Sequence, residues 1–155
     1  MKKDLSKFPD GANLYNTILI DDSPSYIAFG QEKNVLLIPP ADLSDFICFH
    51  KDKDEFPKDM GEFILTINHI FYAAGMMSRI LSRKSHCLRD NLFMLQYKSK
   101  GDGTYAFDRS MYDDLQYYRD GLIELQKVNP TLEFYGGELA KKFFAQPELS
   151  SRFRI

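Results

Sequence analysis

Two adjacent carboxylates, Asp21 and Asp22, directly follow the short apolar run Thr17-Ile-Leu-Ile20. A continuous apolar run is typical of a strand covered on both faces of a parallel sheet, and ligands of open α/β sheets bind at the carboxyl ends of strands. Neighbouring carboxylates repel each other unless a cation offsets their charge. Mg²⁺ suits this role, because it prefers oxygen ligands and is often held by one or two carboxylates together with phosphate oxygens. One interpretation of the pattern is therefore a magnesium site at Asp21 and Asp22.

The same two acids also have a purely structural interpretation. Asp is common at the start of helices, and a helix beginning near Ser25 would follow the turn imposed by Ser23-Pro24. A strand followed by two Asp residues is a short pattern that also arises by chance. The residues alone therefore leave both interpretations open.

The elements around these acids are predicted to be α/β. A second apolar run, Asn34-Val-Leu-Leu-Ile38, is followed by prolines that would stop a strand. Two parallel strands cannot be joined by a tight hairpin, and the segment 21–30 is long enough for a compact crossover. We expect two parallel strands whose carboxyl ends lie at one edge of the sheet.

Beyond residue 42 the pattern becomes helical. Apolar residues at steps of three and four predict one buried helix over 63–81 and another over 111–128, and a last short helix is predicted over 138–144. Ser110 followed by Asp113 resembles an N-cap signal, and Asn129-Pro130 resembles a stop signal. Segment 92–107 stays open between a hairpin turning at 101–103 and a helix end followed by a loop.

Composition limits the classes of function. The 155 residues make about one domain, and a formal net charge of -2 gives no overall field that would attract nucleic acid. The apolar stretch 63–81 is interrupted by Asn68, His69 and Arg79, which favours burial in protein over insertion in a membrane. The chain starts without the apolar run of a secretory signal, and its two cysteines make no disulfide framework. We expect a cytoplasmic protein, with export as an effector left open.

Three segments near the start of the chain occur together in an informative order: Lys3-Asp-Leu-Ser-Lys7, Asn16-Thr-Ile-Leu-Ile-Asp-Asp-Ser-Pro24 and Asn34-Val-Leu-Leu-Ile-Pro-Pro40. Together they resemble the C-terminal half of the phosphatases that act on the RNA polymerase II C-terminal domain and of their NLI-interacting-factor-like relatives. These proteins belong to the haloacid dehalogenase (HAD) superfamily. The resemblance covers residues 3–40 and fades by residue 81, where 59–65 is similar to the family's closing helix.

The resemblance implies roles for four residues. Lys3 stands where the family has a lysine that stabilises the phosphoaspartate and the transferring phosphoryl group, so it is expected to be catalytic and to bind substrate. Asp21 and Asp22 stand where the family has the acidic pair that holds Mg²⁺, directly or through water. Ser23 is expected to shape the substrate-binding loop without reacting. Phosphoryl transfer depends chiefly on positioning and charge neutralisation, which these residue types can supply.

The chain departs from the family at the nucleophile. The family's nucleophile and general acid belong to an Asp-x-Asp-x-Thr motif N-terminal to the lysine, and no such motif precedes Lys3. Without a nucleophile there is no aspartyl-phosphate intermediate, so we expect the chain alone to be inactive or very weak. Asp52-Lys-Asp54 could replace the missing motif only if the order of the family's elements were circularly permuted in this chain. A solvated charged loop is the simpler interpretation of these residues. A longer gene product that carries the missing motif is a further alternative.

Other groups have both functional and structural explanations. Cys48 and His50 could bind a metal or act as nucleophile and base, but a lone cysteine in an apolar run is usually a core residue. His69 is expected to be hydrogen-bonded within a buried helix, and the basic run 79–89 to be a solvated helix end, although it could contact phosphate. The aromatic residues could form a protein-binding surface or pack in a core: Tyr112, Tyr117, Tyr118, Phe134, Tyr135, Phe143 and Phe144.

The sequence thus predicts an α/β fold with a partial HAD-like, Rossmann-like parallel sheet in residues 1–84 and a mostly helical extension in 85–155. The predicted function is the Mg²⁺- and phosphate-binding half of a phosphoprotein phosphatase-like domain, with a phosphoprotein substrate or protein partner selected by the extension. The competing prediction is a non-catalytic interaction module or truncated pseudo-phosphatase, in which the acidic pair has no catalytic role.

Overall fold

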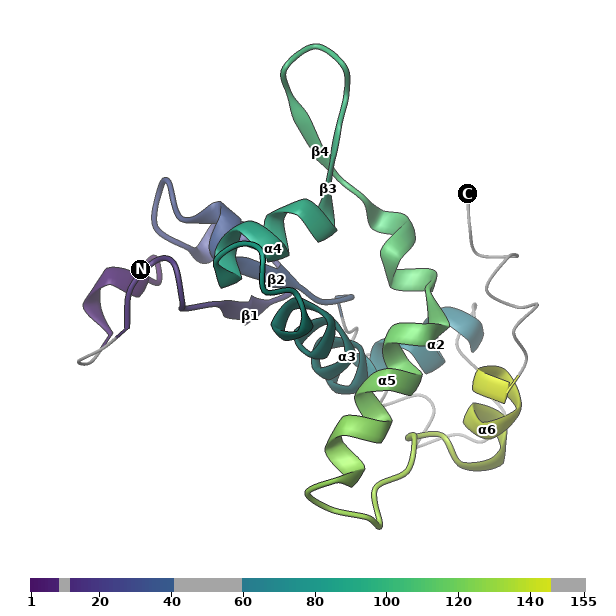
Figure 1. Ribbon diagram of the computed structural model, residues 1–155. Helices are drawn as coiled ribbons and strands as arrows, with labels where there is room; N and C mark the ends of the chain where they lie inside the picture. The colour runs from purple at the N-terminus through teal and green to yellow at the C-terminus, as the bar shows by residue number, and fades with distance from the viewer. Residues whose placement is uncertain (9–11, 41–59, 146–155) are drawn as a thin grey trace.

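The computed structural model (Figure 1) describes residues 1–8, 12–40 and 60–145. In these residues a two-stranded parallel sheet lies beside a group of helices, and a two-stranded antiparallel hairpin projects from them. The prediction of a mixed α/β chain with a parallel sheet is confirmed.

Strands β1 (Leu19–Asp21) and β2 (Val35–Leu37) form the parallel sheet, and their register aligns Asp21 with Leu37. The connection between them contains two 3-10 helices, η2 (Pro24–Tyr26) and η3 (Glu32–Asn34), so the predicted crossover contains 3-10 turns. All three residues of β2 are buried, as its continuous apolar sequence predicts. A further 3-10 helix, η1 (Leu5–Lys7), precedes the sheet.

The prediction of one continuous helix over 63–81 is wrong, because the chain forms α2 (Met60–Ile67) and α3 (His69–Ser82) on either side of Asn68. Asn68 is fully buried. Its Nδ2 donates to the carbonyl oxygens of Ile64 and Tyr135 at 2.9 and 3.0 Å, and its Oδ1 accepts from the Tyr135 backbone N–H at 2.7 Å. The side chain thereby holds the helix break against a segment far along the chain. His69 is half-buried, and its Nδ1 lies 2.5 Å from the Thr66 carbonyl oxygen.

Both interpretations of segment 92–107 are partly right. Helix α4 (Leu88–Gln96) leads directly into β3 (Tyr97–Ser99), which pairs antiparallel with β4 (Tyr105–Phe107). Gly101 and Gly103 in the turn have φ values of 84° and 86°, a region that favours glycine.

The predicted start of the next helix is also wrong. Residues Arg109–Asp113 form the 3-10 helix η4, and α5 (Leu115–Gln126) begins afterwards. Asp114 caps α5 by accepting from the Gln116 backbone N–H at 3.0 Å, whereas Ser110 donates to Asp108, which caps η4. Helix α6 (Gly137–Ala145) lies where the last helix is predicted.

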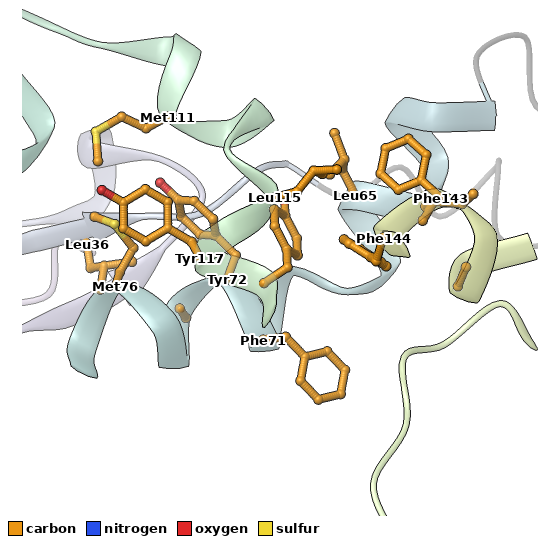
Figure 2. Close-up of a cluster of buried hydrophobic side chains, with 14 of the residues drawn as sticks. Leu36, Leu65, Phe71, Tyr72, Met76, Met111, Leu115, Tyr117, Phe143 and Phe144 are labelled. Carbon is orange, nitrogen blue, oxygen red and sulfur yellow. The ribbon is translucent and has the colours of Figure 1, made fainter. Parts of the chain in front are cut away.

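The core forms where α3 crosses α5 (Figures 1 and 2). Gly75 and Gly121 sit at the crossing, and a Cβ atom at either position would overlap a carbonyl oxygen of the opposite helix. Tyr72 is fully buried and its ring lies 5.4 to 5.7 Å from the rings of three other tyrosines. Leu36 of β2 belongs to the same buried cluster, so the sheet and the helices share one core.

Most of the aromatic side chains singled out in the sequence contribute to this core. Phe134 stacks on Phe144 at 4.0 Å between ring centroids, and Tyr118 lies 5.3 Å from the Phe144 ring. Tyr135 differs from them, because it is 53% exposed. For the buried members, packing is the interpretation that the structure supports.

The basic run 79–89 ends α3 at the surface. Arg83, Lys84 and His86 are exposed, as expected for a solvated helix end. Arg79 is tied down, because its guanidinium lies 3.5 Å from Asp120 and 4.5 Å from the centroid of the Tyr117 ring. Within the described ranges, no helix combines the length and apolar character needed to cross a membrane.

Candidate functional site

The N-terminal segment brings Lys3 to the carboxyl end of β1. Its backbone runs parallel to the segment around Ile27, with the Lys3 N–H donating to Tyr26 at 2.6 Å and the Lys3 carbonyl accepting from Ala28 at 2.7 Å. These bonds fix the backbone of Lys3, and its Nζ reaches Asp21 Oδ2 at 2.6 Å. The Asp21 side chain is only 9% exposed, whereas that of Lys3 is 52% exposed.

Asp21 is held in its ionised form. The hydrogen bond from Lys3 lowers the pKa of Asp21, and the Ser23 backbone N–H, which donates to Oδ1 at 3.1 Å, lowers it further. Partial burial acts in the opposite direction without reversing the lowering. The strand end therefore presents a fixed negative charge with a cation beside it.

Ser23, and not the acidic pair, caps the short helix that follows. The Ser23 hydroxyl oxygen accepts from the Ser25 backbone N–H at 3.3 Å, which makes Ser23 the N-cap of η2. The interpretation of Asp21 and Asp22 as caps of a helix near Ser25 is therefore wrong in this structure. Asp22 is exposed at the start of the turn.

A magnesium ion bound at the strand end would have to keep most of its water ligands. In the described part of the chain, no group of three or more His, Cys, Asp or Glu side chains gathers as a metal site. Both oxygens of Asp21 already accept a hydrogen bond, from Lys3 and from Ser23. Mg²⁺ is commonly held by one or two carboxylates, water and phosphate oxygens, so Asp22 would be the direct ligand and Asp21 would act through water.

Tyr112 and Gln96 lie near these acids, although nothing in the sequence connects either residue with the acidic pair, and Tyr112 is expected there only as a core or surface aromatic residue. The hydroxyl of Tyr112, in η4, donates to the Ile38 carbonyl at 3.2 Å, and the Ile38 N–H donates to the Asp21 carbonyl at 3.0 Å. Burial raises the pKa of Tyr112 to about 12, with the Arg109 charge opposing the rise and the Asp22 charge adding to it. The segment after the hairpin thus lies over the end of the sheet.

Gln96 fastens the helical region to β2. It is fully buried, its Oε1 accepts from the Leu37 N–H at 2.9 Å, and its Nε2 donates to the Val35 carbonyl at 2.8 Å. The Gln96 carbonyl also accepts from the Asp108 N–H at 2.8 Å. The Gln96 side chain therefore satisfies backbone groups of the strand next to the acidic pair, and its backbone carbonyl connects that strand to the start of η4.

A surface cavity of about 460 Å³ lies between α4, the β4–η4 segment and the start of α5. Its polar lining includes Lys98, Asp108, Asp114 and Tyr117, and Lys98 pairs with Asp108 at 2.9 Å. Lys3, Asp21 and Asp22 do not line it.

The structure brings together Lys3, Asp21 and Ser23, with Asp22 next along the chain. The sequence hypotheses for Cys48 with His50 and for Asp52 with Asp54 concern residues outside the described ranges. Comparison of the chain with protein-family models, with curated proteins and with solved structures finds no match in any of the three.

Proposed function

We propose that this chain is the Mg²⁺- and phosphate-binding part of a HAD-like, phosphatase-related protein that acts on phosphoprotein. The observation that carries the proposal is the 2.6 Å contact between Lys3 Nζ and Asp21 Oδ2 at the carboxyl end of a parallel strand, with Asp22 next to it. Phosphoryl groups are bound and transferred chiefly through positioning and charge neutralisation. A lysine and two carboxylates at a strand end supply the groups for both.

Each residue has a separate task in this proposal. Asp22, exposed and next to the fixed charge of Asp21, would hold Mg²⁺, which when bound neutralises phosphate oxygens. Lys3 has three N–H donors; one contacts Asp21, and the half-exposed ammonium can give another to phosphate. Ser23 shapes the loop by capping η2.

The competing function is a non-catalytic interaction module. It is favoured by the fact that both Asp21 oxygens already accept hydrogen bonds within the chain. In that case the Lys3–Asp21 pair only ties the N-terminal segment to β1, and Mg²⁺ has no effect on the chain.

A Mg²⁺ titration followed by amide NMR shifts distinguishes the two functions. We expect Mg²⁺ to shift the amides around Asp22, and Asp22→Asn to weaken binding by about tenfold or more, as loss of a ligand or its supporting partner does in metal sites. Asp102→Asn, in the exposed turn between β3 and β4, removes the same charge elsewhere and should leave Mg²⁺ binding unchanged. A wild-type chain that does not respond to Mg²⁺ would overturn the proposal.

The missing nucleophile motif leads to a separate prediction about activity. With Mg²⁺ present, the chain alone should release no appreciable 4-nitrophenol from 4-nitrophenyl phosphate, because no aspartyl-phosphate can form. Appreciable hydrolysis that Asp22→Ala abolishes would contradict this expectation and point to a nucleophile within the chain. The variants Asp52→Asn and Asp54→Asn would then show which carboxylate serves.

A further inference from the structure

The segment after the hairpin is anchored to Ile38, which follows β2 and bonds the backbone of Asp21. Ile38 donates its N–H to the Asp21 carbonyl and accepts from the Tyr112 hydroxyl through its own carbonyl. At the N-terminal end of η4, the Asp108 N–H donates to the Gln96 carbonyl. The Gln96 side chain in turn donates to the Val35 carbonyl of β2. Residues 109–113 are thus held at the same sheet end as the acidic pair by bonds at both sides.

Arg109 is the first residue of this segment, and no described residue forms an ion pair with it. Its side chain is exposed, and within the described ranges its guanidinium forms no ion pair. Arg79 and Arg89 differ, because each lies against a carboxylate, at 3.5 and 3.2 Å. Arg109 and Tyr112 are three residues apart in the 3-10 helix η4, so their side chains leave the same side of the helix, and the Tyr112 hydroxyl bonds the Ile38 carbonyl at this sheet end.

The charges of the proposed site, counted with a phosphate monoester bound, require one further cation. With Mg²⁺ bound, the two carboxylates would offset the metal's charge, and Lys3 would offset one of the two negative charges of a phosphate monoester. A second cation is needed to offset the remaining negative charge of the phosphate monoester. A guanidinium suits this task, because its planar set of N–H donors matches two phosphate oxygens.

We infer that Arg109 is a substrate-binding residue, which contacts non-reacting oxygens of a phosphate monoester held at Asp22 and so makes the site selective for dianionic monoesters over monoanionic diesters. This inference rests on the proposed function. It also gives the helical extension a direct part in the site, in addition to the substrate selection that the sequence predicts.

The test measures binding of phenyl phosphate and of dimethyl phosphate at saturating Mg²⁺ by ligand-observed NMR. We expect Arg109→Gln to weaken phenyl phosphate binding by about tenfold, the loss of one hydrogen-bonded charge contact, and to change dimethyl phosphate binding less. Arg109→Lys should recover part of the affinity. Arg83→Gln removes an exposed arginine from the end of α3 and should change neither affinity.

Mg²⁺ affinity, measured on the same variants, separates failure of this inference from failure of the proposed function. Arg109 is exposed, so Arg109→Gln should fold like the wild type and bind Mg²⁺ as well. If Arg109→Gln binds Mg²⁺ and phenyl phosphate as Arg83→Gln does, Arg109 has no role in substrate binding and the metal site stands. If the wild type binds no Mg²⁺, both proposals fail.

Discussion

Asp21 is the residue on which the candidate site depends most. Its carboxylate accepts hydrogen bonds from Lys3 and Ser23, and its carbonyl accepts from Ile38. Because the hydrogen bonds from Lys3 and Ser23 to the carboxylate lower the pKa of Asp21 in the folded chain, the unfolded chain takes up the proton more readily. The stability that Asp21 contributes is therefore fully present above its ordinary pKa of 3.8 and is lost as the pH falls through the lowered value.

This linkage predicts how Lys3→Gln behaves. At pH 7 the substitution should lower the free energy of unfolding by about 0.5–1 kcal/mol, the range for a pair with one exposed partner. At a pH of about 2 the loss should be smaller, since protonation then removes the Asp21 charge in the wild type as well. Urea unfolding at both pH values measures the difference. Lys100→Gln, in the exposed hairpin turn, is the control, and equal losses for Lys3→Gln at both pH values would contradict the assigned pair.

How much of the site could be predicted depends on distance along the chain. Asp21, Asp22 and Ser23 directly follow an apolar run, which indicates an acidic strand end, and the resemblance to the phosphatases implies that Lys3 lies beside it. The structure places Lys3 against Asp21, as the resemblance implies. Tyr112 could not be found in this way, because 74 positions separate it from Ile38 and no local pattern marks a tyrosine that bonds a strand carbonyl.

The crossing of α3 and α5 shows how closely two elements depend on each other. At Gly75 an added Cβ would overlap the Tyr117 carbonyl oxygen, and at Gly121 it would overlap that of Phe71. The obstacle in both cases is backbone, which cannot move aside as the end of a flexible side chain can. Only residues without a Cβ allow the two helices to approach this closely.

We therefore predict that Gly75→Ala destabilises the chain despite the higher helix propensity of alanine. Overpacking against backbone should lower the free energy of unfolding by about 3 kcal/mol or more, at the upper end of the usual range. Urea unfolding followed by circular dichroism provides the measurement. Gln116→Ala, on the exposed face of α5, should change stability by less than about 0.5 kcal/mol. A Gly75→Ala variant as stable as the wild type would show that the helices do not cross here.

The boundaries of the elements were harder to predict than their existence. Apolar periodicity continues through 63–81, so the break at Asn68 is invisible until its side chain is seen to bond Tyr135. The sequence places the start of α5 too early, because Ser110 and Asp114 are both residue types that cap helices. Asp114 is the residue that caps α5, and the turns before it form η4. The local sequence indicates that a helix forms, and tertiary contacts decide where that helix begins and ends.

Contacts between the sheet and the helices suggest how the whole molecule unfolds. The sequence predicts separate regions 1–84 and 85–155, yet Gln96 bonds both Val35 and Leu37, and Tyr112 bonds Ile38. A two-stranded sheet is at best marginally stable alone. Its strand β2 shares the buried cluster with α3 and α5. We predict that the described part of the chain unfolds as one cooperative unit.

Gln96→Met tests this prediction, because it removes both side-chain hydrogen bonds to β2 at nearly constant volume. Leaving the Val35 carbonyl and the Leu37 N–H unpaired should cost about 2 kcal/mol or more. If the chain unfolds as one unit, native-state hydrogen exchange should show the same loss of protection at the Leu37 amide and at the slowest amides of α5. Gln116→Met, on the exposed face of α5, should alter neither. Loss of protection at Leu37 with α5 unchanged would instead mean that the sheet unfolds separately from α5, as the predicted division between residues 84 and 85 implies.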